Sequence, residues 1–382
     1  KEYKLNNNTA VLIVRPRGLH LEEKNATIDG KRISGTFFDL GLSLFHNAKK
    51  LILNGSGPYF YLPKLEHYLE CRLLNDVISF CEKKLGLEIG TVKVTVLIET
   101  INAVFQMDEF LWELKDHIVG LNAGRWDYLF SYQKVYRNTK KVILPDRSKV
   151  NMFVPFMSNY NKLLVDTCHK RGAFGMGGMS AQVIAKANPK EINEKALAGV
   201  KKDKERELNQ GNDGAWVAHP SLVEPVKNIF EKNFDGPNQL KKFNNDKINR
   251  RDLLDEPKIE NAITENGLRE NLQEGIEYMA YWLFGTGASV VNYLMADVAT
   301  CEVSRAQLWV WLKYKVKLDD GREVNEDLID KLISEELDET RKRVGNEVFK
   351  KVPFEDAAKI FKDMITAKNF DDFLTLSLYE KI

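Results

Sequence analysis

The sequence is poor in several features that define particular classes of protein. Among its 382 residues it has only four cysteines, which are scattered and form no CxxC pair. Neither a structural zinc site nor a disulfide framework is therefore expected, and a reducing compartment fits best. No apolar run approaches the roughly 20 residues that cross a bilayer. The N-terminus carries no basic segment followed by an apolar one, as a secretory signal would.

Charge of one sign is also lacking, because 56 Lys and Arg residues balance 55 Asp and Glu residues to a net charge of +1. This balance gives no electrostatic attraction to nucleic acid or to a membrane, so neither is expected as a partner. The composition is typical of a soluble globular protein.

We expect a cytoplasmic location. A glyoxysome or peroxisome is the alternative, although the chain ends in Tyr379-Glu380-Lys381-Ile382 and not in a Ser-Lys-Leu signal.

Apolar, β-branched runs alternate with amphipathic segments in the first two thirds of the chain, which favours a parallel α/β architecture. The run 9–14 predicts a strand buried on both faces. About seven strands are expected, one fewer than an eight-stranded barrel has, and the missing strand could precede Lys1. Further strands are predicted near 58–64, 92–98, 119–122, 150–154 and 215–218, with helices at 37–54, 65–85, 107–118, 157–171 and 191–207.

Two segments of this region have weaker patterns. Residues 173–179 are rich in glycine and predict a turn. The charged run in helix 191–207 predicts a solvated face.

The pattern changes from Gly236, where strands give way to helical periodicity that continues to the end of the chain. The sequence therefore predicts two domains, a barrel domain over 1–235 and a helical domain over 236–382.

Two carboxylates follow successive predicted strands. Glu99 ends the run 92–98, and Asp127 comes after the next strand, behind the small residue Gly124 and the side chains of Arg125 and Trp126. Carboxylates at neighbouring strand ends can hold Mg²⁺, which takes one or two protein ligands and keeps several waters. Two unrelated surface acids would give the same spacing.

A third acid, Asp297, lies in a largely apolar segment after a glycine break. Desolvation would raise the pKa of such a carboxyl, which suits a general acid or base. Asp297 could equally be the N-cap of the helix that follows it. The histidines His117, His169 and His219 show no metal-ligand spacing and are expected to be structural.

The segment from Lys115 to Phe130, with Gly-Leu-Asn-Ala-Gly-Arg-Trp-Asp-Tyr at its centre, resembles the signature of the shorter bacterial and glyoxysomal malate synthases. Other blocks resemble the same family over essentially the whole chain. They are 15–21, 55–64, 97–100, 171–174, 216–220 and 304–309.

This resemblance implies a TIM (β/α)8 barrel, its first strand apparently lacking here, and a helical C-terminal domain. It implies an acyltransferase that condenses acetyl-CoA with glyoxylate and hydrolyses the product to malate and CoA, with Mg²⁺ as cofactor. Its site residues would be Glu99 and Asp127 for the metal, Gly124, Arg125, Trp126 and Asp127 for glyoxylate, Arg15 for the enolate oxygen and the substrate, Asp297 as base, and Phe174 and Met176 for the acetyl-CoA channel.

The sequence departs from the family at two positions beside this site, with Ala296 in place of a glutamate and Ala123 in place of a frequent cysteine. Two alternatives stay open at this point. One is a related Mg²⁺-dependent malyl- or citramalyl-CoA lyase, and the other is a truncated chain without catalytic activity. The oligomeric state is not defined by the sequence.

Overall fold

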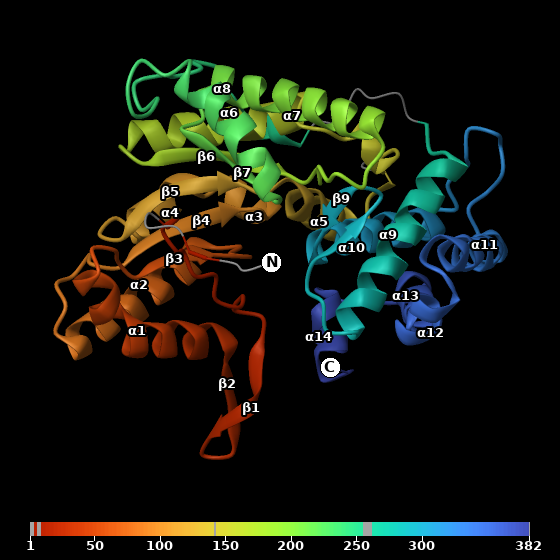
Figure 1. Ribbon diagram of the computed structural model, residues 1–382, viewed down its shortest axis with the longest axis horizontal. Coiled ribbons are helices and arrows are strands. Elements are labelled where there is room, and N and C mark those ends of the chain that lie inside the picture. The colour runs from red at the N-terminus through yellow and green to blue at the C-terminus, as the bar shows by residue number, and fades with distance from the viewer. Residues whose placement is uncertain (1–3, 6–8, 141–142, 255–261, 382) are drawn as a thin grey trace. The chain divides into compact units, whose positions relative to one another are not determined.

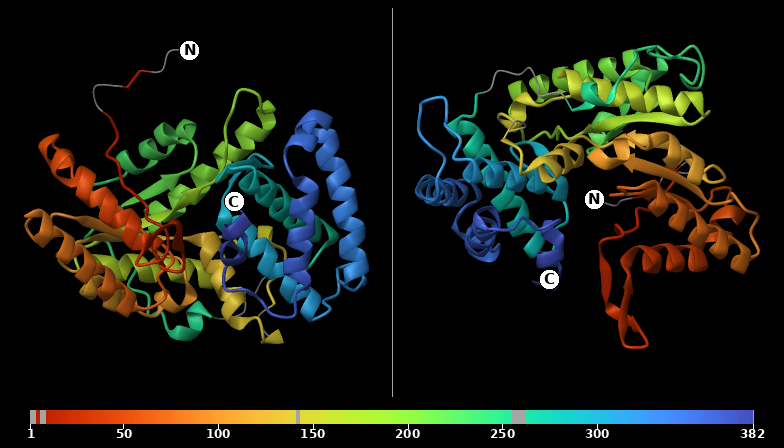
Figure 2. Two further views of the ribbon diagram at one scale, coloured as in Figure 1. Left: turned by 90° about the horizontal axis from the view of Figure 1, so that it is seen from below. Right: turned by 180° about the vertical axis from the view of Figure 1, so that it is seen from behind.

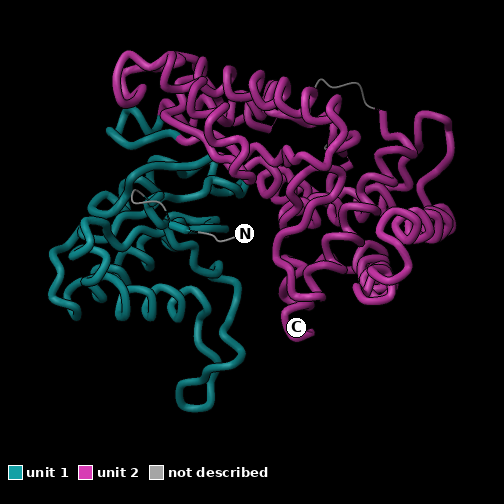
Figure 3. Tube along the Cα trace, viewed as in Figure 1, with its two compact units in different colours: residues 1–122, 167–175 teal, residues 123–166, 176–382 magenta. Residues whose placement is uncertain are grey.

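The computed structural model describes residues 4–5, 9–140, 143–254 and 262–381. The chain forms two compact units. Unit 1 comprises residues 1–122 and 167–175, and unit 2 comprises 123–166 and 176–382 (Figure 3). The boundary expected near residue 236 stays a prediction.

Five parallel strands form the main sheet, in the order β3-β4-β5-β6-β7. The strand order follows the chain order, which is the winding of a (β/α) barrel. In unit 1, Tyr59 of β3 pairs with Lys93 of β4, and β4 is buried from Val94 to Ile98, as expected for a strand covered on both faces. The strands are β3 (Tyr59–Leu62), β4 (Lys93–Ile98), β5 (Ile118–Ala123), β6 (Phe174–Ser180) and β7 (Gly214–Val217).

Helices connect these strands (Figure 1). The boundaries of α2 illustrate how the sequence sets them: His67 and Glu70 form a capping box at its start, and Gly86 ends it in the left-handed conformation, with φ of 67°. The helices are α1 (Gly35–Leu53), α2 (Tyr68–Leu85), α3 (Ile101–Val104), α4 (Met107–Glu113), α5 (Arg125–Tyr136), α6 (Pro155–Lys170), α7 (Lys190–Gln210) and α8 (Val223–Glu231).

An antiparallel hairpin of β1 (Glu22–Ile28) and β2 (Lys31–Ser34) precedes α1 and was not expected. Asp29 and Gly30 form its turn, with φ of 51° and 73°. An Asp-Gly pair at positive φ is typical of a two-residue hairpin turn. This dipeptide was therefore a signal for the hairpin in the sequence.

The prediction of a buried strand over 9–14 is wrong for the described conformation. Only Val14 pairs, in a parallel bridge to Phe60 of β3. The side chains of Val11 and Leu12 are 63% and 73% exposed. Their apolar character therefore does not reflect burial in the described chain, although Val14 does lie beside the sheet edge.

The predictions for 150–154 and 173–179 are also wrong. The first segment contains no strand, and a 3-10 helix, Arg147–Lys149, precedes it. The second segment is strand β6, whose glycines serve close packing in place of a turn: a Cβ added at Gly177 would lie 2.2 Å from Glu207 Oε2. The buried carboxylate of Glu207, on α7, therefore packs directly against the backbone of β6 at Gly177.

Helix α7 corrects a further prediction, because its charged run is not simply a solvated face. Lys204 and Glu207 are both fully buried. Lys204 Nζ donates to the carbonyl of Gly178 at 2.7 Å and lies 3.0 Å from Glu207 Oε2, while Gly178 N donates to Glu207 Oε1 at 2.8 Å. The pair therefore ties α7 to the backbone of β6.

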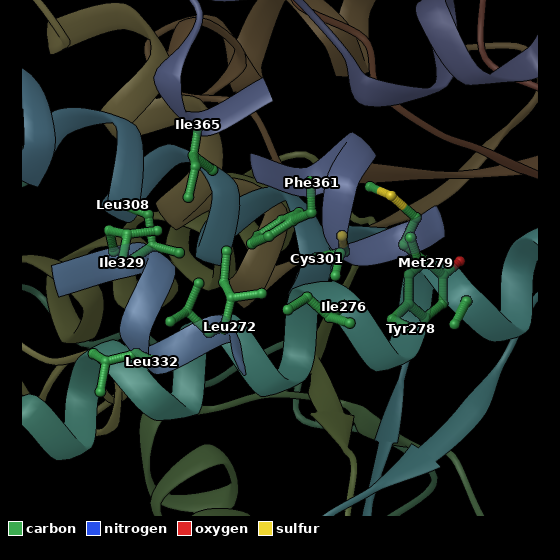
Figure 4. Packing of buried hydrophobic residues seen from close by; sticks show 14 of the residues in the cluster. Leu272, Ile276, Tyr278, Met279, Cys301, Leu308, Ile329, Leu332, Phe361 and Ile365 are labelled. Atoms are coloured by element: carbon green, nitrogen blue, oxygen red, sulfur yellow. The ribbon is translucent and has the colours of Figure 1, made fainter. Parts of the chain in front are cut away.

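The C-terminal part of unit 2 is largely helical, as expected (Figure 2). Its core is formed by apolar side chains of α9, α10, α11 and α13, among them Leu272, Leu308, Ile329 and Phe361 (Figure 4). The helices are α9 (Glu265–Leu283), α10 (Val298–Lys313), α11 (Glu326–Val344), α12 (Asn346–Lys351), α13 (Phe354–Thr366) and α14 (Leu374–Leu378). Within the described residues, no helix has the length and apolarity that crossing a bilayer requires.

This region is not free of strands, contrary to the prediction. A hairpin of β8 (Ser289–Val291) and β9 (Leu294–Ala296) directly precedes Asp297. The hairpin also pairs with the segment after β6: Val183 N donates to the Tyr293 carbonyl at 2.9 Å and Met295 N to the Ala181 carbonyl at 2.7 Å. These bonds fix the start of α10 relative to the carboxyl end of β6.

Candidate active site

In unit 1, Glu99 directly follows β4 and is only 2% exposed. Its Oε1 accepts a hydrogen bond from Lys64 N at 2.6 Å and lies 3.6 Å from Lys64 Nζ. Lys64 follows β3 with φ of 61°, in the left-handed region. A neighbouring ammonium and a backbone N–H are both groups that stabilise an ionised carboxylate, and the ionised form is the one that binds a metal.

Arg15 lies in the same unit, against Tyr61 of β3. The guanidinium carbon is 5.5 Å from the centre of the Tyr61 ring. Burial raises the pKa of Tyr61, the charge of Arg15 opposes this, and the charge of Glu99 adds to it. The structure therefore brings Arg15 and Glu99 near the same phenol.

In unit 2, the segment after β5 begins helix α5, with Gly124 as its N-cap. Gly124 N donates to Tyr160 Oη at 2.9 Å, and the ring of Tyr160 stacks on that of Tyr128 with a centroid distance of 4.4 Å. The backbone N–H groups of Arg125, Trp126 and Asp127 belong to the first turn of α5, where the helix supplies no acceptors. The first turn therefore suits an anion.

Asp297 is the N-cap of α10, which confirms one of the two alternatives from the sequence. Its Oδ1 accepts from Ala299 N at 3.0 Å and from Thr300 N at 3.3 Å. The cap orients the carboxyl group and does not exclude a catalytic role, because a carboxylate has a second oxygen.

Helices α5 and α10 pack side by side in unit 2. Trp126 at the start of α5 contacts Arg147, which bonds the first turns of α10. Asn138, just after α5, accepts a hydrogen bond from Lys313 at the end of α10. The two helices therefore run parallel, and Asp127 and Asp297 lie at the same end of the pair.

Arg147 is a residue that the sequence did not indicate. Its Nη1 donates to Ser304 Oγ at 2.8 Å and to the Thr300 carbonyl at 3.4 Å, and its Nη2 lies 3.3 Å from Glu274 Oε2. The guanidinium carbon lies 5.2 Å from the centre of the Trp126 ring. Arg147 thus joins the first turn of α5 to the helix that Asp297 caps, and only the fold brings these segments together.

The described residues contain no group of three or more His, Cys, Asp or Glu side chains that could hold a metal ion. Mg²⁺ does not need such a group, since one or two carboxylates together with waters and substrate suffice. Glu99 is a buried carboxylate, and its oxygens are donors of the kind that a hard cation takes.

Residues 11–256 match the family model for the malate synthase TIM barrel domain, and residues 262–382 match the model for the malate synthase C-terminal region. The chain is 46% identical over 383 residues to a malate synthase of Myxococcus xanthus (strain DK1622), covering 100% of this chain and 70% of that protein. The chain belongs to the malate synthase family.

Other relatives agree with this assignment. A glyoxysomal malate synthase of Cucumis sativus is 46% identical over 390 residues, with 100% of this chain and 68% of that protein covered. A solved Haloferax volcanii malate synthase, a ternary complex with pyruvate and acetyl-CoA, is 13% identical with a TM-score of 0.50, over 85% of this chain and 76% of that one. The likeness to the solved structure supports the fold alone.

Membership in the malate synthase family confirms the resemblance and the fold class expected from the sequence. It also confirms the expected enzyme class and function, a transferase that acts on acetyl-CoA and glyoxylate. The roles of individual residues stay predictions. Phe174 and Met176, expected at the acetyl-CoA channel, are both half-buried and lie on β6.

Proposed function

We propose that this malate synthase depends on Mg²⁺, held by Glu99 and Asp127, and that Arg15 and Asp297 act on the acetyl group. The observation that carries the proposal is the parallel packing of α5 and α10, with Asp127 and Asp297 at the same end. A carboxylate for the metal and a carboxylate for proton transfer are thereby supplied from two helix starts within one unit.

The first turn of α5 would bind the glyoxylate carboxylate through the backbone N–H groups of Arg125, Trp126 and Asp127. Gly124 supports this loop, because its own N–H is held by Tyr160. A bound Mg²⁺ would polarise the aldehyde of glyoxylate as a Lewis acid. Phe174 and Met176 would line the path of the acetyl thioester.

Asp297 would remove a proton from the methyl group of acetyl-CoA. The guanidinium of Arg15 would stabilise the negative charge that develops on the thioester oxygen. The enolate carbon then attacks the aldehyde carbon of glyoxylate, forming the new C–C bond, and the aldehyde oxygen becomes the hydroxyl of the product. Water cleaves the thioester and releases CoA as its thiol.

The same assignment divides the chain by role, with the metal and glyoxylate residues in 1–235 and Asp297 in 236–382.

For location we propose the cytoplasm, with the glyoxysome as the alternative. All four cysteines are free thiols, in keeping with a reducing compartment.

The test measures CoA thiol release from acetyl-CoA and glyoxylate by the full chain, with Mg²⁺ and with a chelator. Release that requires both glyoxylate and Mg²⁺ supports the proposal, and equal release with the chelator contradicts the metal assignment. Accumulation of a malyl thioester without CoA release would indicate the lyase alternative. Absence of turnover in a chain with a cooperative thermal transition would indicate the non-catalytic alternative.

A further inference from the structure

Arg15, the side chain proposed to act on the thioester oxygen, is exposed and lies in a segment of unit 1 that is neither helix nor strand. Its position therefore depends on what holds the chain on either side of it. On the N-terminal side, Val14 N donates to the Tyr59 carbonyl at 2.9 Å, and Tyr61 N donates to the Val14 carbonyl at 2.9 Å. Pro16 follows Arg15, and its ring fixes φ at that position. The chain is thus anchored to β3 one residue before Arg15.

On the C-terminal side, Arg17 anchors the chain to helix α1. Its Nε and Nη2 donate to the two oxygens of Asp39 at 3.0 and 2.8 Å, a bidentate pair. The main chain of the same residue is held as well, because Arg17 N donates to Asp39 Oδ2 at 2.8 Å and the Arg17 carbonyl accepts from Thr36 Oγ1 at 2.7 Å. Both the side chain and the backbone are therefore fixed two residues after Arg15.

The guanidinium of Arg17 also binds a second carboxylate and fits closely against the start of α1. Its Nη1 lies 2.8 Å from Glu23 Oε2 of β1, and Glu23 Oε1 accepts from Asn25 N at 2.6 Å. A Cβ added at Gly35, the first residue of α1, would lie 3.1 Å from Arg17 Nε and 3.3 Å from its Cζ. These separations are shorter than ordinary contacts, so a larger residue would press on the guanidinium. Arg17 is thus placed by both α1 and the β1–β2 hairpin.

Stabilisation of the fold alone explains this arrangement poorly. The side chains of Arg17 and Asp39 are 25% and 24% exposed, and partly exposed ion pairs contribute little to stability. A bidentate pair also joins Arg171 and Asp108 in unit 1, at 2.6 and 2.7 Å. The Arg17 pair differs in its place in the chain, since it fixes the backbone next to the residue that carries the proposed charge.

We propose that Arg17 and Asp39 are positioning residues for Arg15, an inference that rests on the proposed role of Arg15. They hold the main chain on one side of Arg15 as the pairing of Val14 holds it on the other. A charge stabilises a developing oxyanion most effectively when it is in place before the reaction. A displacement of about 1 Å can cost about a hundredfold in rate.

The experiment measures steady-state CoA release by the full chain carrying Asp39→Asn. Asparagine has nearly the shape of aspartate but offers one acceptor oxygen in place of two. We expect kcat to fall by about tenfold or more, while KM for glyoxylate changes by less than about twofold. Asp39→Glu keeps the carboxylate and should recover part of the lost kcat. The matched control is Asp108→Asn, which breaks the bidentate pair with Arg171 and should leave kcat unchanged.

A double-mutant cycle tests whether the effect is transmitted through Arg15. In an Arg15→Met background there is no guanidinium to place, so adding Asp39→Asn should lower kcat by less than about a further twofold. A general structural defect would lower kcat by the same factor in both backgrounds. If Arg15→Met has no measurable turnover, the recovery of kcat in Asp39→Glu decides.

Three results would overturn the proposal. They are a wild-type kcat in Asp39→Asn, an equal fall of kcat in Asp108→Asn, and an equal further fall in the Arg15→Met background. Thermal denaturation of each variant reports folding. If Asp39→Asn does not fold, Arg17→Lys, which keeps the charge but loses the planar fork, replaces it in the same cycle.

Failure of the proposed function has a separate signature. A kcat of Arg15→Met equal to that of the wild type would contradict the role of Arg15, and with it this proposal, without any change at Asp39. A reduced kcat in Arg15→Met with a wild-type kcat in Asp39→Asn would contradict the positioning role alone.

Discussion

Arg147 Nη1 donates a hydrogen bond of 2.8 Å to Ser304 Oγ, although the two residues are 157 positions apart in the chain. This bond, with the one to the Thr300 carbonyl, holds the first turns of the helix that Asp297 caps. Arg147 does so while contacting Trp126 of the proposed glyoxylate loop.

Replacing Arg147 by lysine should keep the positive charge but lose the second guanidinium nitrogen. Because small displacements of reacting groups are costly, we expect kcat to fall by about tenfold to a hundredfold, with less effect on KM. Steady-state CoA release measures both constants. Arg341→Lys, at an exposed arginine paired with Glu355, is the matched control. An unchanged kcat in Arg147→Lys would contradict the positioning role.

Asp297→Asn separates the cap of α10 from the proposed base. Asparagine is as good an N-cap as aspartate, so stability should change little. An amide cannot accept the methyl proton, and we expect CoA release to fall by about a hundredfold or more. The measurements are thiol release and thermal denaturation of the same sample. Equal activity of the variant and the wild type would show that the assigned mechanism is wrong.

Tyr160→Phe removes the acceptor that holds Gly124 N–H at 2.9 Å. Loss of one neutral hydrogen bond is worth about 0.5–1.5 kcal/mol, so KM for glyoxylate should rise about twofold to tenfold. KM for acetyl-CoA should stay close to its wild-type value. Tyr136→Phe, a change at the other end of α5, provides the comparison. A selective change in the acetyl-CoA constant would argue against this role for the loop.

His117 and Glu82 give a prediction about stability. Both are fully buried, with His117 Nε2 at 2.9 Å from Glu82 Oε2 and Nδ1 at 2.9 Å from Asn75 Oδ1. His117→Leu would remove one hydrogen-bond partner of the buried carboxylate, which keeps Val92 N as a donor at 2.8 Å. We expect a loss of about 1–3 kcal/mol in the free energy of unfolding. Urea denaturation measures it, with the exposed His46→Leu as control. Equal loss in both variants would contradict the argument.

The pH dependence of stability should reveal the raised pKa of Glu274. Burial raises its pKa above the ordinary 4.5, while the charge of Arg147 and a hydrogen bond from Thr300 oppose the rise and the charges of Glu277 and Asp297 add to it. The folded protein therefore keeps a proton that the unfolded chain releases. The contribution of Glu274 to stability falls as pH increases from 4.5 through the folded-state pKa.

Glu274→Gln removes this dependence. The unfolding free energy of the variant minus that of the wild type should therefore increase with pH in this window, by at most about 1.4 kcal/mol per unit. Urea denaturation between about pH 5 and 7 measures the difference. The exposed Glu339→Gln should show no such trend. A difference that decreased with pH would mean that the ionised form is the one the fold favours.

Much of the fold could be predicted because its signals are local. The run before Glu99 is buried as β4, and the break at Gly86 ends α2. Strand β6 was not recognised because its glycines are required by Glu207, which lies on a helix later in the chain. Burial of Lys204 could not be inferred, since its partner carbonyl belongs to Gly178.

In the candidate site, too, some residues have a local signal in the sequence and others are placed only by contacts with distant segments. Glu99 and Asp127 follow strands and could be proposed from spacing. For Asp297 the sequence allows an N-cap or a general base, and it contains no local signal that the helix after Asp297 packs beside α5. Arg147 has no local signal, because each of its partners lies on a distant segment of the chain.

The pairing of the β8–β9 hairpin with residues 181–183 has a consequence for folding. These partners are separated by more than a hundred residues of chain, so closing the loop between them costs entropy before the contacts are gained. Asp297 comes directly after this hairpin. We therefore expect the carboxyl of Asp297, the proposed base, to reach its place late during refolding, after α9 and α10 have formed locally. Recovery of activity should then lag behind recovery of helical circular dichroism.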